Sequence, residues 1–257
     1  MRGTLSTNPL ASFLSLLRLI RESNPGHPPL SMFHAWAGSA EVPTSTVVKI
    51  AAYAIEQAEA AATYISCTQL SDEAKQGLLQ TTSSLITAFQ LQHLGGNAVS
   101  QFLPALDAGI SQFAILISAA GLDREPAPLE EIADLVAAID HFSGSLDEVG
   151  LDELVRETAR KHLAVLKALL EHVDALGVDA AMAAYYELVL RLRSADSNSS
   201  TSSKERMAKI WPEVERWAGR LTIIEQAYTQ GGHLLGELGR PAQQLLTHMP
   251  AIPGIAG

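Results

Sequence analysis

The sequence predicts an all-α fold, a bundle of about eight to ten helices in one or two lobes. Alanine and leucine are abundant while aromatic residues make up 5% of the 257 residues, and this mixture favours helix over sheet. Apolar residues recur three and four positions apart in successive segments, whereas no stretch alternates apolar and polar residues as a half-buried strand does. An apolar fraction of 47% is enough for a globular core.

Capping residues and prolines predict where the helices begin and end. Asn8 favours the N-cap position and Pro9 the first helical position, while Asp72 and Glu73 complement the dipole of a helix that follows Ser71. The predicted helices span about residues 9–23, 31–36, 44–65, 72–93, 97–120 with an interruption at 104, 129–142, 151–176, 178–193 and 204–229 with a bend at 212.

The segment from Leu151 to Leu176 has the most regular pattern. Its apolar positions are spaced alternately four and three residues apart, and His162 lies on the same stripe. Gly177 ends this helix, and the following segment forms the second helix of a hairpin. The hairpin from Asp152 to Arg193 is similar to uncharacterised bacterial all-helical proteins, in which a long striped helix is followed by a glycine and an Ala/Leu-rich helix. The resemblance covers about a quarter of the chain; it implies a bacterial origin and no particular activity.

Two regions are predicted along the chain. Residues 1–125 form an N-terminal helical region and residues 126–257 a C-terminal one, unless both pack as one domain. Residues 194–203 are polar and of low complexity, so we expect a flexible link there.

Composition excludes several classes of function. The net charge is −10 and the 18 basic residues are scattered, so duplex nucleic acid is not an expected partner. The single cysteine, Cys67, excludes an intramolecular disulfide framework and favours a cytoplasmic protein. We interpret Cys67 as a small buried residue, and His141 and His172, which each follow an acid, as solvated surface residues.

Most sequence motifs of catalysis and cofactor binding are missing. No histidine has a glutamate three residues before it, as di-iron bundles require, and no His-Glu-x-x-His zinc motif occurs. Phosphate-binding loops and the Gly-x-Ser-x-Gly elbow are missing too. The sequence therefore predicts no cofactor and no metal, and it favours a non-enzymatic protein.

One pair of residues is a candidate catalytic site. Arg156 and His162 are six residues apart in a predicted helix, and this spacing resembles the motif of the HEPN ribonucleases. The resemblance implies metal-independent RNA cleavage by the pair across a dimer, as in a toxin or phage-defence effector, with RNA as the partner. Glu157 departs from the family pattern, because its charge would oppose an approaching phosphate. Six residues turn a helix by roughly 240° beyond one full turn, which leaves the side chains about 120° apart. The alternative is a buried or half-buried His162 with one hydrogen bond and a solvated Arg156.

Charge is missing from a long internal stretch. From Gln76 to Leu122 the only ionic residue is Asp107. Three interpretations are open: these helices are central in the bundle, they form a permanent interface with a partner or second copy, or they contact a membrane when triggered. Constitutive membrane insertion is not expected, because the 15 residues from Ala108 to Leu122 are fewer than the roughly 20 that span a bilayer.

These observations favour an interaction or regulatory protein that acts through apolar helix faces on itself or on a protein partner. The alternatives are the HEPN-like ribonuclease and a conditionally membrane-active effector.

Overall fold

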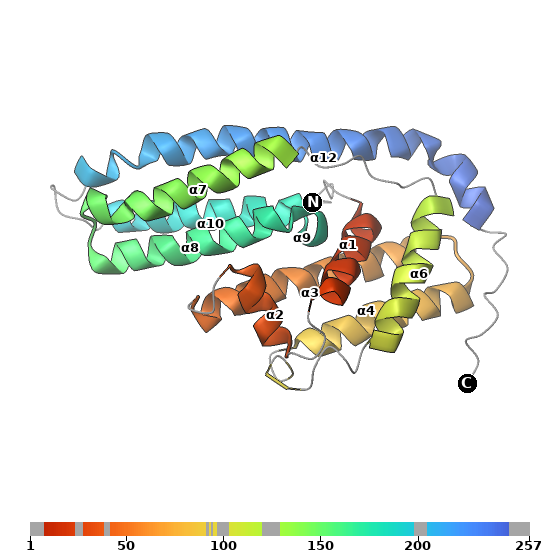
Figure 1. Cartoon of the computed structure of the whole chain (residues 1–257). Helices are drawn as coiled ribbons and strands as arrows, with labels where there is room; N and C mark the ends of the chain where they lie inside the picture. The colour runs from red at the N-terminus through yellow and green to blue at the C-terminus, as the bar shows by residue number, and fades with distance from the viewer. Residues whose placement is uncertain are drawn as a thin grey trace.

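The described residues of the computed structural model form helices and no strands, which confirms the predicted all-α class (Figure 1). The structure describes residues 8–23, 28–38, 42–90, 93, 95–96, 103–119, 129–197 and 205–246. Its helices are α1 (Pro9–Glu22), α2 (Pro29–Trp36), α3 (Thr44–Cys67), α4 (Asp72–Phe89), α6 (Leu103–Ala119), α7 (Leu129–Val149), α8 (Glu153–Glu171), α9 (Val173–Leu176), α10 (Val178–Ser197) and α12 (Trp211–Leu246).

Helix α1 lies at the centre of the molecule and packs against α3, α6 and α9. The side chain of Asn8 accepts a hydrogen bond from the Leu10 backbone N–H at 3.0 Å, so the predicted N-cap is confirmed. Most of the helix surface is apolar and buried, and Phe13 meets Phe113 of α6 edge to face with ring centroids 5.0 Å apart. A helix that is apolar on nearly all sides needs neighbours on nearly all sides.

Helices α7, α8, α10 and α12 lie side by side as an elongated four-helix bundle (Figure 1). Phe142 of α7 and Trp217 of α12 meet inside it with ring centroids 5.1 Å apart, and Trp217 is fully buried. Helices α1, α2, α3, α4 and α6 gather on the side of α8 and α9, where α3 packs against both.

An aromatic cluster joins the two groups of helices. Phe33 of α2 contacts both Trp36 and Phe89 at centroid distances of 5.0 and 4.9 Å, and Trp36 in turn lies 5.4 Å from the ring of His172. His172 interrupts the helix predicted over residues 151–176, with φ −119° and ψ 29°, and thereby separates α8 from α9. His172 is half-buried, so our interpretation of it as a surface residue is wrong.

The boundaries of α7, α10 and α12 differ from the prediction. Helix α7 continues through Gly144 to Val149, because Phe142 and Leu146, one turn apart, both reach the core. Their burial outweighs the roughly 1 kcal/mol that glycine costs inside a helix. Helix α10 continues to Ser197, and α12 begins at Trp211, with a turn before Pro212 instead of a bend, and runs to Leu246. The remainder of the predicted link, residues 198–203, lies outside the described residues.

Helices α4 and α6 cross at two glycines. A Cβ atom on Gly109 of α6 would lie 2.5 Å from Cγ2 of Thr81, whereas a Cβ atom on Gly77 of α4 would lie 3.8 Å from the Gln112 side chain. Thr81 is buried and β-branched, so it has little freedom to move away.

We therefore predict opposite effects of two alanine substitutions. Gly77→Ala should raise the free energy of unfolding by about 0.5–1 kcal/mol through helix propensity. Gly109→Ala gains the same propensity but overpacks the crossing, and it should lower the free energy of unfolding by about 1 kcal/mol. Urea denaturation followed by circular dichroism measures both. Equal shifts in the two variants would contradict the close approach at Gly109.

Candidate functional site

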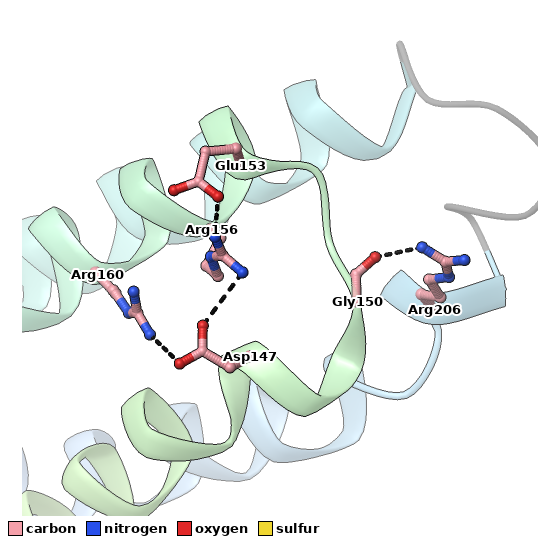
Figure 2. Close-up of polar contacts among 6 residues, drawn as sticks. All are labelled: Asp147, Gly150, Glu153, Arg156, Arg160 and Arg206. Atoms are coloured by element: carbon pink, nitrogen blue, oxygen red, sulfur yellow. Dashed lines mark hydrogen bonds and ion pairs between the residues drawn. The ribbon is translucent and has the colours of Figure 1, made fainter.

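Arg156, the first of the two candidate residues, is directed towards α7. Its guanidinium contacts Asp147 Oδ1 at 3.2 Å and also pairs with Glu153 of its own helix (Figure 2). Arg160 Nη2 binds the other oxygen of the same Asp147 carboxylate at 2.6 Å. Arg156 is 23% exposed at its side chain. Its charge is therefore already balanced by two carboxylates.

A third arginine, Arg206, contacts the turn between α7 and α8. Gly150 adopts a φ of 71°, a left-handed conformation that suits glycine, and its carbonyl oxygen accepts a hydrogen bond from Arg206. Figure 2 shows Arg206 on the segment that precedes α12, on the other side of the turn from Arg156 and Arg160. The three arginines thus connect α7, α8 and the segment that precedes α12 at this end of the bundle.

His162, the second candidate residue, is directed towards α3 and α10. It is buried, as its position on the apolar stripe predicts, with an exposed fraction of 8%. Its Nδ1 lies 4.0 Å from Glu187 Oε1, and the same oxygen accepts a hydrogen bond from Lys49 Nζ at 2.6 Å. Arg191 lies 3.9 Å from this oxygen. We call His162, Glu187, Lys49 and Arg191 the His162 cluster. It joins α3 of the N-terminal helices to α8 and α10 of the bundle.

Charges and burial set the protonation of this cluster. Burial, reinforced by the nearby Lys49, lowers the pKa of His162 below its ordinary value of 6.5, although Glu187 opposes the shift. Burial alone would raise the pKa of Glu187, but the hydrogen bond and the charge of Lys49, together with His162 and Arg191, outweigh burial and leave that pKa below its ordinary value. Tyr53, close by on α3, has a raised pKa because of burial and the charge of Glu187. At neutral pH the cluster therefore holds an ionised Lys49–Glu187 pair beside a neutral His162.

The structure does not bring Arg156 and His162 together within one chain. Arg156 contacts acids beside α7, and His162 contacts groups of α3 and α10, as expected for positions about 120° apart on one helix. Each of the two side chains contacts an acid on a neighbouring helix, and this contact gives it a role in packing.

Helices α4 and α6, which carry the stretch with few charges, are not buried among the other helices. On α4 the exposed positions are Asp72, Glu73 and Ala74 in the first turn and then Gln76, Gln80, Ser83 and Thr87, and on α6 they include Asp107, Ser111 and Ile115. Asp107, the ionic residue of this stretch, pairs with Arg21 of α1 at 2.8 Å. Each helix buries one face and exposes another that carries few charges: none on α4 after Lys75, and Asp107 alone on α6. A central position therefore does not explain the missing charge.

A second exposed surface lies on α10 and was not predicted. Tyr186 and Leu190, one turn apart, are 56% and 66% exposed. Arg193 follows on the same face, and its guanidinium lies 5.8 Å from the ring centre of the partly buried Trp211. We call Tyr186, Leu190, Arg193 and Trp211 the α10 patch. The other large apolar side chains that are exposed in the described part of the chain lie singly on other helices: Tyr64, Ile115, Leu154 and Ile223.

Three further findings concern metals, membranes and the cysteine. Among the described residues, no group of three or more His, Cys, Asp or Glu side chains could hold a metal ion. Within the same residues, none of the helices is both long enough and apolar enough to cross a bilayer. Cys67 is exposed at the end of α3, so the expectation that it is buried is wrong.

Comparison of the chain with protein-family models, with curated proteins and with solved structures finds no match.

The His162 cluster predicts a pH dependence of stability. Because the pKa of His162 is lower in the folded chain, the unfolded chain takes up a proton first as the pH falls, and protonation favours unfolding. The stabilisation is present above the ordinary pKa of 6.5 and is lost as the pH falls through that value towards the folded-state pKa. We expect the free energy of unfolding to decrease between about pH 7.5 and pH 5.

His162→Gln should flatten this decrease, measured by urea denaturation at a series of pH values. His141→Gln changes an exposed histidine of α7 and serves as the matched control, which should keep the wild-type slope. His172, whose pKa is also lowered by burial, accounts for the slope that remains. An unchanged slope in His162→Gln would show that this histidine is not held neutral.

Proposed function

We propose that this chain is a non-enzymatic helical interaction protein that binds a protein partner through the α10 patch. The observation that carries the proposal is the exposure of Tyr186 and Leu190 on one face of one helix. Burial of large apolar side chains is the main favourable term in protein association, so their exposure in a free chain is unfavourable unless a partner covers them.

The composition of the patch supports a protein partner. Tyrosine, tryptophan and arginine are the residue types that contribute most binding energy in protein interfaces. Arg193 already lies over the Trp211 ring. A partner therefore meets a partly ordered surface, and less side-chain entropy is lost on binding.

The contacts of Arg156 and His162 on α8 also support a non-enzymatic function. Arg156 and His162 contribute to the packing of α8 against its neighbours through Asp147 and Glu187. A ribonuclease that uses this pair would need a second copy to reach His162, and burial of that side chain disfavours such contact. We propose a cytoplasmic location, because the exposed thiol of Cys67 suits a reducing compartment.

The test is site-specific photo-crosslinking in the cells that produce the protein. A photoreactive residue at position 190 should give one adduct of defined mass, and Tyr186→Lys in the same chain should abolish it. The control places the photoreactive residue at Glu157, an exposed position on the charged side of α8. Tyr186→Lys should change the free energy of unfolding by no more than about 0.5 kcal/mol, because the side chain is exposed. Identical adducts from positions 190 and 157, or none from position 190, would contradict the proposal.

A further inference from the structure

Four exposed side chains follow one line along α10, three, four and three residues apart: Ala183, Tyr186, Leu190 and Arg193. This is the spacing of the contact positions of a helix that packs lengthwise against another helix. The half-buried Met182 and Val189 flank the line on one side and add apolar surface to it. The line therefore has the pattern of a helix–helix contact whose second helix is missing.

The surroundings of this line suit a helix better than an extended segment. Helices α8, α9 and α12 pack against other sides of α10. The described residues contain no strand, so they offer no sheet edge to which a partner could add a strand. A helix can pack here because side chains three and four residues apart form ridges that fit the grooves of a facing helix. The small Ala183 lets the two helices approach, while Tyr186 and Leu190 supply the large apolar contacts.

Two arginines indicate which charge the partner carries. The Arg193 guanidinium lies 5.8 Å from the ring centre of Trp211, and within the described residues no carboxylate lies within ion-pair distance of it. Arg191 shares the one carboxylate of Glu187 with Lys49. Both arginines therefore favour an additional carboxylate, which a guanidinium binds through two hydrogen bonds. A basic partner would be repelled here and drawn instead to α7, whose Asp, Glu, Lys and Arg residues are all acidic.

We propose that the partner binds the α10 patch as an amphipathic α-helix that lies along α10, with apolar residues against Tyr186 and Leu190 and a carboxylate at Arg193. This inference rests on the function proposed above and specifies the structure and charge of the partner segment. Positions 183 to 193 extend over about 15 Å of helix, so the segment needs about three helical turns.

The first test measures the register of the contact. Photoreactive residues are placed singly at positions 183 and 190, and mass spectrometry locates the labelled residue of the partner. Helices rise about 1.5 Å per residue, so a helical partner should be labelled at two sites about seven residues apart. An extended segment rises about 3.3 Å per residue, and its labelled sites would lie about three residues apart.

The control for this test is position 154, because Leu154 is an apolar residue of α8 that is 76% exposed. A photoreactive residue there should not label the same segment. A spacing of about three residues, or a crosslink from position 190 to another part of the same chain, would overturn the proposal.

The second test reverses the charge at the end of the line. With the photoreactive residue at position 190, Arg193→Glu should lower the adduct yield about tenfold, because the partner carboxylate then meets a like charge. Arg18→Glu is the matched control, since it makes the same change at an exposed position of α1 and should keep the wild-type yield. Circular dichroism checks that both variants are folded.

The two proposals fail in different ways. An adduct that Tyr186→Lys abolishes and Arg193→Glu leaves unchanged would keep the α10 patch as the binding surface and overturn the acidic helical partner. The absence of any adduct from position 190 in the wild-type background would overturn the proposed function itself.

Discussion

The burial of α1 is the constraint on which the rest of the structure depends. This helix buries residues on nearly every side, including Leu10, Phe13 and Leu16, and its contacts reach α6 on one side and α9 on another. No single partner helix could cover such a surface. The N-terminal helices and the bundle must therefore meet around α1, and Trp36 on His172 adds a second junction between the same two groups. Because the helices around α1 turn their apolar faces inward, their outer faces are left to determine solubility and contacts.

Ion pairs set the register of the bundle that α1 holds in place. Lys167 binds Asp140 at 2.7 Å and Arg160 binds Asp147 at 2.6 Å. The acids are seven residues apart on α7 and the bases seven apart on α8, in opposite order, as an antiparallel pair of helices requires. These side chains are partly exposed, so each pair contributes at most about 1 kcal/mol. Their effect is on alignment, because a shift by one turn would separate both pairs at once. This role explains why basic residues lie at intervals along α8.

The sequence predicts most of the fold because local signals and burial agree over most of the chain. Asn8, Ser71 and Gly177 mark helix ends both in the sequence and in the structure. At Gly144 they disagree, since a local signal for a break is outweighed by the burial of Phe142 and Leu146. Whether burial outweighs the local signal depends on which helix packs against this segment, and the sequence alone does not show that. The interruption at His172 depends in the same way on its contact with Trp36, which is distant in the sequence.

The candidate surfaces were predictable to different degrees for a related reason. The missing charge from Gln76 to Leu122 is visible in the sequence, but its meaning depends on which faces of α4 and α6 are exposed. His162 could be placed on a buried stripe from its spacing, whereas the pairing of Arg156 with Asp147 requires the position of α7. The α10 patch gave no signal, because Tyr185 and Leu188 of the same helix are buried and resemble the exposed Tyr186 and Leu190 in type. Only the packing of the neighbouring helices distinguishes them.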